Sequence, residues 1–235
     1  MESGLQREAL ILAGGFGSRL RPTVDNRPKP LAEVCGRPFL ERLLQQLLRF
    51  DYQRAIMCVG YCGEQIRTQL GESYGALALD YSFETHPLGT GGALRKATSM
   101  VRGRYVLAMN GDSFCDMDLK ELAEAHLKHG GEVTIAAVYL KARSQTVELD
   151  PDHRVVEFNS HPPPQTPGLI SAGVYMFSRE ALDAIPEGRA VSLENEVFPQ
   201  LAARKSLFGW PVEAAFIDIG TPESYQLAQK FFADR

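Results

Sequence analysis

The chain has 235 residues, a hydrophobic share of 44% and a formal net charge of −4 at pH 7. This hydrophobic share is typical of a well-packed soluble core, and no segment approaches the roughly 18 to 20 consecutive apolar residues that span a bilayer. The acidic balance argues against a nucleic-acid-binding surface, which usually carries a basic excess. We therefore expect a soluble protein that has neither a membrane nor a nucleic acid as its partner.

The N-terminal segment and the cysteines favour a cytoplasmic protein. Residues 1–8 are polar and lack the basic and apolar regions of a secretory signal. The four cysteines are Cys35, Cys58, Cys62 and Cys115. Their spacing matches no metal finger, and three of them lie within or beside apolar runs, so we interpret them as reduced packing residues.

Apolar runs of strand length alternate with helical periodicity through the first part of the chain. Strands are expected at 9–12, 55–59, 105–109 and 133–138, and helices at 39–50, 91–101 and 119–128. This alternation predicts an α/β fold of Rossmann-like type, with a largely parallel wound sheet covered by helices on both faces.

The pattern loosens after Tyr139 into shorter alternating strands. Strands are expected at 155–158 and 169–177, and helices at 193–203, capped by Ser192, and from Pro222 onward. We interpret this part as a smaller lobe of mixed strands. Because no linker-like run divides the chain, we expect a single domain over residues 1–235, with halves of about 1–138 and 139–235.

A glycine-rich loop with basic residues follows the first strand. Residues 12–22 read Leu-Ala-Gly-Gly-Phe-Gly-Ser-Arg-Leu-Arg-Pro, and Arg-Pro-Lys-Pro-Leu follows at 27–31. Glycines let the backbone pass close to a triphosphate, and Arg19 and Lys29 supply the positive charge that such an anion requires. The loop therefore predicts a polyphosphate site.

Two better-known glycine loops do not fit this segment. A Walker A loop needs Gly-Lys-Ser/Thr, which is absent, and the dinucleotide fingerprint fails at its third glycine, where Leu20 stands. A nicotinamide-dependent oxidoreductase is thereby weakened as an alternative.

Two aspartates are expected at strand ends. Asp112 follows the strand 105–109 within Asn-Gly-Asp, and Asp218 ends a later apolar run. Open α/β sheets bind ligands at the carboxyl ends of their strands. Two carboxylates there suit Mg²⁺, which takes oxygen ligands and keeps waters and substrate phosphates.

These motifs resemble the sugar-nucleotide pyrophosphorylases, the family of sugar-1-phosphate nucleotidylyltransferases. Its signature G-x-G-x-R-L-x-P, followed by P-K-P-L, is matched at 15–22 and 28–31. Further family motifs follow in order at 59–61, 87–94, 110–112, 171–175 and 216–222. Within the family, the segments 192–199 and 216–223 look most like D-glycero-α-D-manno-heptose 1-phosphate guanylyltransferases.

The resemblance implies that GTP and the heptose 1-phosphate are joined to GDP-heptose and pyrophosphate, for a capsule, an S-layer or another surface polysaccharide. It implies Mg²⁺ on Asp112 and Asp218, with Arg19, Lys29 and Asp112 as catalytic residues. The candidate nucleotide-binding residues are Leu12, Ala13, Gly14, Gly15, Gly17, Ser18, Arg19, Lys29, Glu84, Gly89, Thr90, Asn110 and Gly111. The candidate sugar-binding residues are Glu157, Gly173, Glu194, Asn195 and Asp218. Glu84 is chosen because a carboxylate can accept from guanine N1–H and the exocyclic amine.

One position departs from the family. Many relatives carry Glu-Lys soon after a Val-x-x-Phe strand, and the lysine meets the sugar phosphate, whereas Asn159-Ser160 stands here. Arg143, Arg154 and His161 are nearby basic candidates for that contact, and we favour an arginine over a metal-only contact.

Several alternatives stay open. The enzyme could use mannose 1-phosphate with GTP, or another hexose 1-phosphate with UTP or dTTP. A non-catalytic sugar-nucleotide sensor is an alternative of another class. The sequence also leaves open whether the chain forms a homodimer.

Overall fold

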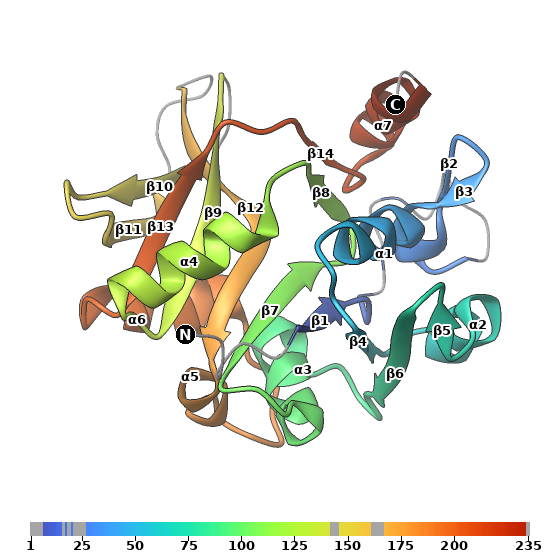
Figure 1. Ribbon diagram of the computed structural model, residues 1–235, viewed down its shortest axis with the longest axis horizontal. Helices are drawn as coiled ribbons and strands as arrows, with labels where there is room; N and C mark the ends of the chain where they lie inside the picture. The colour runs from blue at the N-terminus through green and yellow to red at the C-terminus, as the bar shows by residue number, and fades with distance from the viewer. Residues whose placement is uncertain are drawn as a thin grey trace.

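An eight-stranded sheet runs through the molecule in the order β13-β9-β12-β7-β1-β4-β6-β5 (Figure 1). The computed structural model describes residues 7–15, 17, 20, 27–141, 146–160 and 167–233, with only the backbone at 159 and 160. The strands of the sheet are β1 (Glu8–Leu12), β4 (Arg54–Val59), β5 (Ser73–Tyr74), β6 (Leu77–Phe83), β7 (Tyr105–Asn110), β9 (Val133–Leu140), β12 (Gly168–Ser178) and β13 (Leu207–Val212).

The sheet is mostly parallel. The strands β6, β4, β1 and β7 form a parallel series, and β13 is parallel to β9. The long strand β12 lies between β7 and β9 and is antiparallel to both, while β5 is antiparallel to β6. The looser pattern after Tyr139 thus corresponds largely to strands that join the main sheet.

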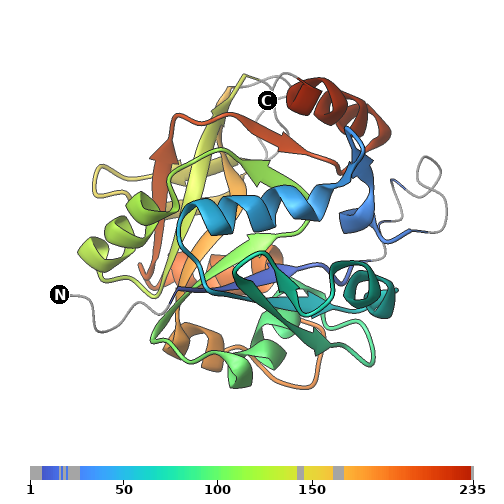
Figure 2. The same cartoon turned by 45° about the vertical axis from the view of Figure 1, so that its right-hand side comes forward.

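Helices cover both faces of the sheet, because neighbouring strand residues point to opposite sides. In β1, Ile11 packs into the core under α1 (Phe39–Arg49), α2 (Gly63–Leu70), α4 (Leu119–His129) and α7 (Pro222–Ala233). Leu10 packs into the core under α3 (Gly89–Ala97), α5 (Arg179–Asp183) and α6 (Phe198–Ala203). Figure 2 shows α1 and α3 on opposite sides of the sheet. The expected α/β class is confirmed.

In the described part of the chain, three two-stranded sheets lie outside the main sheet. They pair β2 (Glu33–Val34) with β3 (Arg37–Pro38), β8 (Ser113–Cys115) with β14 (Phe216–Asp218), and β10 (Thr146–Leu149) with β11 (Val155–Ser160). The second pair matters for the site, since Ser113 lies opposite Asp218. The Ile219 N–H also donates to the Asp112 carbonyl over 2.9 Å.

Two expected helices differ locally. The first begins at Gly89 rather than near 91 and continues as a 3₁₀ turn, Thr98–Met100. The second begins as a π-helical turn, Leu193–Val197, before α6, and its Ser192 side chain caps it by accepting from the Asn195 N–H, as predicted. Among the described helices, none has the length and the apolar run needed to cross a bilayer.

Candidate active site

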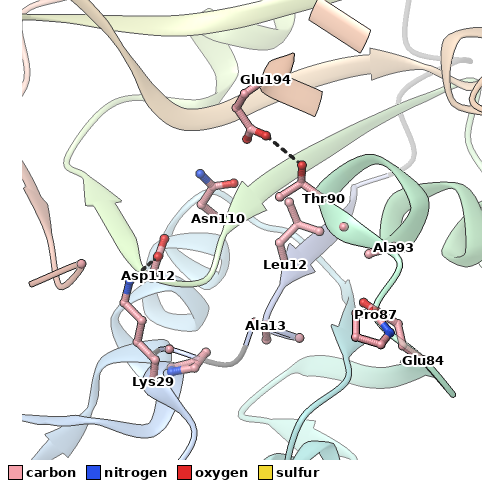
Figure 3. Close-up of a pocket in the computed structure, with 16 residues that line it drawn as sticks. Leu12, Ala13, Lys29, Glu84, Pro87, Thr90, Ala93, Asn110, Asp112 and Glu194 are labelled. Carbon is pink, nitrogen blue, oxygen red and sulfur yellow. Dashed lines mark hydrogen bonds and ion pairs between the residues drawn. The ribbon is translucent and has the colours of Figure 1, made fainter. Parts of the chain in front are cut away.

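A pocket of about 530 Å³ opens at the carboxyl ends of β1, β6 and β7. It is lined by Leu12, Ala13, Gly14, Gly15, Gly17, Lys29, Pro30, Glu84, Pro87, Gly89, Thr90, Ala93, Asn110, Asp112, Glu194 and Gly220. Figure 3 shows three groups of polar side chains around it: Lys29 with Asp112, Glu84 beside Pro87, and Glu194 with Thr90. This is the edge where α/β sheets bind their ligands.

The first group is an ion pair between Lys29 and Asp112. The Lys29 Nζ lies 2.5 Å from the Asp112 Oδ2, and the two side chains are 11% and 40% exposed. A Cβ on Gly220 would lie 3.0 Å from the Asp218 Oδ1 and 3.8 Å from the Lys29 Nζ, so all three charged side chains gather at this end. A largely buried cation beside two carboxylates gives this end of the pocket groups that can meet both an anionic ligand and a metal ion.

Gly17, in the glycine-rich segment, lies close to the Lys29 side chain. Its backbone has a φ of +60°, and a Cβ there would lie 2.9 Å from the Lys29 Cβ. Both the left-handed backbone and this close approach require glycine. Glycine at this position therefore lets the Lys29 side chain pass close to the loop backbone on its way to Asp112.

The second group is centred on Glu84, which follows β6. Its Oε2 accepts from the Leu88 N–H over 3.0 Å, and its Oε1 lies 2.8 Å from where a Cβ on Gly14 would stand. The pKa of the Glu84 carboxyl is raised, chiefly by burial, and the hydrogen bond from the Leu88 N–H offsets part of this increase. A half-buried carboxyl thus faces the loop backbone at this end of the pocket.

The third group joins Glu194 to the start of α3. The Thr90 Oγ1 donates to the Glu194 Oε2 over 2.9 Å, and the Ser192 Oγ donates to the same oxygen over 3.0 Å. Two hydroxyl donors hold one carboxylate oxygen and thereby orient the side chain.

Asn110 lines the pocket between these groups and is backed by the strand β12. The Asn110 Nδ2 donates to the hydroxyl of the fully buried Tyr175 over 3.5 Å, and the Ser171 Oγ donates to the same hydroxyl over 3.3 Å. Gly173 has a φ of +71°, and a Cβ there would lie 2.4 Å from the Ser113 Oγ and 2.9 Å from the Asn110 Nδ2. The glycine therefore leaves the space that the Asn110 amide occupies.

The structure brings most of the predicted site residues together. Those that line the pocket are Leu12, Ala13, Gly14, Gly15, Gly17, Lys29, Glu84, Gly89, Thr90, Asn110, Asp112 and Glu194. Gly111 lies beneath it, where its N–H donates to the Leu12 carbonyl over 2.9 Å. Ser18 and Arg19 lie outside the described residues.

Three candidates lie elsewhere. Glu157 is exposed on β11, opposite Glu148 of β10, and Asn195 is exposed with its N–H bonded to the Ser192 Oγ. Arg154 donates to Asp152, 2.7 Å away, and its guanidinium lies 5.8 Å from the centre of the Phe208 ring. Phe208 pairs with Thr134, near the start of β9 and away from the carboxyl edge, so Arg154 lies apart from this pocket. Arg143 and His161 lie outside the described residues.

The sequence reasoning missed several residues of the site. Pro30, Pro87, Ala93 and Gly220 line the pocket, and the side chains of Ser192 and Tyr175 orient its polar groups. Pro30, Pro87 and Gly220 belong to motifs that were recognised, so their neighbours were a usable signal. Tyr175 lies in the motif recognised at 171–175, but its contact with Asn110 depends on its register beside β7.

The carboxylates fit a magnesium ion that shares its ligands with substrate. Asp112 and Asp218 supply hard oxygen atoms from adjacent segments. Among the residues that the structure describes, no three His, Cys, Asp or Glu side chains form a ready metal cluster. Mg²⁺ commonly binds in this way, through one or two carboxylates together with substrate phosphates and water.

The chain is similar in sequence and fold to known proteins. Residues 8–235 match the nucleotidyl transferase family. The D-glycero-alpha-D-manno-heptose 1-phosphate guanylyltransferase of Aneurinibacillus thermoaerophilus is 34% identical over 95% of this chain and 97% of its own length. The mannose-1-phosphate guanylyltransferase of Mycobacterium tuberculosis is 33% identical over 94% of this chain, which spans 63% of that longer protein.

The structural comparison agrees. A crystal structure of HddC from Yersinia pseudotuberculosis complexed with GMP-PN has a TM-score of 0.85 and 30% identity, over 96% of this chain and 99% of the other. The motif order, the pocket at the carboxyl edge and these similarities lead to one conclusion: the chain belongs to the nucleotidyl transferase family.

Proposed function

We propose that the protein transfers a guanylyl group from GTP to D-glycero-α-D-manno-heptose 1-phosphate, giving GDP-heptose and pyrophosphate. The 34% identity to a heptose 1-phosphate guanylyltransferase over nearly the full length of both chains supports the substrates. The Lys29–Asp112 pair in the pocket, with Asp218 close to the pocket residue Gly220, supports the chemistry and is the observation that carries the proposal.

In this reaction a phosphate oxygen of the sugar 1-phosphate attacks the α-phosphorus of GTP. One P–O bond forms, the bond between the α-phosphorus and the bridging oxygen breaks, and pyrophosphate leaves with the electron pair. A phosphate monoester has its second pKa near 6, so the nucleophile is largely dianionic at neutral pH and needs no general base. The protein has to hold two anions in line and offset their repulsion.

Among the residues that the structure describes, Lys29 brings a positive charge into the pocket to offset this repulsion. Its ammonium group, paired with Asp112, would contact the phosphates where the two substrates meet. Asp112 and Asp218 would hold Mg²⁺, which when bound supplies further positive charge to the phosphates. We expect Arg19 to hold the departing phosphates, as the loop sequence indicates.

Glu84 is our candidate for guanine recognition. Its Oε2 is bonded to the Leu88 N–H, and its Oε1 faces the backbone at Gly14. A carboxylate in that place would accept from the N1–H and the exocyclic amine of guanine, and neither uracil nor thymine offers this donor pair. Glu84→Gln should lower kcat/KM for GTP by more than for UTP.

The nucleotide contacts then come mainly from residues 1–138 and the sugar contacts from residues 139–235. In this proposal Glu194 and the strand β12 at Gly173 face the sugar. Glu194 lines the pocket from the second half of the chain, which supports this division of the single domain.

The test is a grid of GTP, UTP and dTTP against heptose 1-phosphate and mannose 1-phosphate, with pyrophosphate release as the readout. GTP with the heptose 1-phosphate should be the best pair, and mannose 1-phosphate should react more slowly because it lacks a carbon and a hydroxyl. Faster turnover of mannose 1-phosphate would favour the second candidate, which the 33% identity to a mannose enzyme supports. Preference for UTP or dTTP would refute the guanylyl proposal, and nucleotide-sugar binding without pyrophosphate release would indicate a sensor.

A further inference from the structure

Thr90 belongs to the segment expected to bind the nucleotide, yet its side chain bonds to the other half of the chain. It is the second residue of α3, and its Oγ1 donates to the Glu194 Oε2 over 2.9 Å. The Thr90 Oγ1 also accepts from the Leu193 N–H over 2.8 Å. The hydroxyl hydrogen and a lone pair of Thr90 are therefore both engaged. Figure 3 shows the contact with Glu194.

The backbone around Thr90 is joined to the same segment. The Val191 carbonyl accepts from the N–H groups of Gly91, over 2.9 Å, and Gly92, over 3.3 Å. The Val191 N–H donates to the Leu88 carbonyl over 2.8 Å. The first turn of α3 and the residues before Glu194 thus form one hydrogen-bonded unit.

Glu194 depends on this unit for its orientation. It lies in the π-helical turn Leu193–Val197, an irregular element in which the Val197 N–H reaches back to the Ser192 carbonyl over 3.2 Å. Such turns are frequent at functional sites and are held by specific contacts rather than by a regular helix. The hydroxyls of Thr90 and Ser192 fix one carboxylate oxygen, which turns the side chain into the pocket.

We propose that Thr90 is a positioning residue for the sugar half of the pocket, acting through the Glu194 carboxylate. The inference rests on the proposed function in that it takes the ligand of Glu194 to be the sugar. This proposal assigns two roles to one turn. Gly89 and Thr90 line the pocket where the nucleotide is expected, and the Thr90 hydroxyl orients the carboxylate that would contact the sugar.

The test compares binding of GDP and GDP-mannose by calorimetry, which needs no turnover. The parent should bind GDP-mannose more tightly than GDP, because Glu194 contacts the sugar. Thr90→Val keeps the side-chain shape but removes the hydroxyl, and should reduce that preference by about tenfold, which equals about 1.4 kcal/mol, while the affinity for GDP changes by less than about twofold. Thr90→Ser, which keeps the hydroxyl, should retain the preference.

A double variant checks that the effect passes through Glu194. Glu194→Ala should itself abolish the preference, and adding Thr90→Val should cause no further loss. The proposal is overturned if Thr90→Val keeps the parent's preference, if GDP affinity falls as much as GDP-mannose affinity, or if Thr90→Ser behaves like Thr90→Val. Failure of the proposed function appears separately, as a parent protein that releases no pyrophosphate in the substrate grid.

Discussion

Gly173→Ala should damage both stability and activity, because the new methyl group has no room. The backbone φ of +71° disfavours an L side chain by roughly 1 to 2 kcal/mol. The methyl carbon would lie 2.4 Å from the Ser113 Oγ and 2.9 Å from the Asn110 Nδ2, and such overpacking costs about 1 to 3 kcal/mol. We therefore expect the free energy of unfolding to fall by about 2 to 5 kcal/mol.

Gly130→Ala is the matched control. Gly130 ends α4 with a φ of +66°, and a Cβ there would meet nothing within 4 Å, so only the backbone cost of roughly 1 to 2 kcal/mol remains. Urea unfolding with equal m-values measures both variants. Gly173→Ala should also lower kcat/KM more than about tenfold by displacing Asn110, while the control stays near the parent. Equal stability loss in the two variants, with normal turnover at Gly173→Ala, would refute the steric reasoning.

Three further predictions concern charge. Lys29→Ala and Arg19→Ala should each lower kcat/KM by at least about a hundredfold, or roughly 2.7 kcal/mol. Lys120 is an exposed lysine paired with Asp51, so Lys120→Ala is the control and should leave kcat/KM unchanged. Near-normal pyrophosphate release by both loop variants would exclude the phosphate role. EDTA should abolish turnover and Mg²⁺ restore it, and Asp218→Asn should raise the Mg²⁺ concentration required; full activity in chelator would contradict this. Burial, and secondarily the charge of the neighbouring His129, lowers the pKa of His126 from 6.5 to about 4. Between pH 6.5 and about 4 the unfolded chain therefore binds a proton at His126 that the folded protein does not bind. Stability should therefore be fully present above pH 6.5 and fall by up to about 3 kcal/mol as pH drops toward 4, and the His126→Asn variant should show a flatter dependence in urea unfolding between pH 4.5 and 7; parallel curves would refute it.

The residues that could be predicted from the sequence are those that a short motif places. The glycine loop directly follows β1, and Asn110 directly follows the buried part of β7, so both reach the carboxyl edge once the strands are parallel. Lys29 and Asp112 were each expected in the site on this basis. Their direct contact was not, because 83 residues separate them and no periodicity reports which strand ends become neighbours.

The positions of Glu157 and Tyr175 relative to the pocket depend on which strand pairs with which. Glu157 lies in the expected strand, but β11 pairs with β10 in a separate sheet and Val156 and Glu157 are both exposed, so the strand pattern alone does not direct Glu157 to the pocket. Tyr175 lies in the strand expected at 169–177, but its hydroxyl reaches Asn110 because β12 lies antiparallel beside β7. Register between distant strands is set by packing and is absent from local patterns.

The ion pair between Lys29 and Asp112 makes stability and catalysis inseparable in single variants. The Lys29 side chain is 11% exposed, so Asp112→Asn would leave a largely buried cation without this partner. Removing both charges, in Lys29→Met with Asp112→Asn, avoids that cost. Without ligands, the double variant should therefore be more stable than Asp112→Asn alone by roughly 1 to 2 kcal/mol, a value reduced because Asp112 is 40% exposed and partly screened by water. Both should be inactive. Thermal and urea unfolding give the comparison, and a double variant less stable than Asp112→Asn would show that Asp218 and the pocket backbone already compensate the lysine, so that the pair serves chemistry rather than the fold.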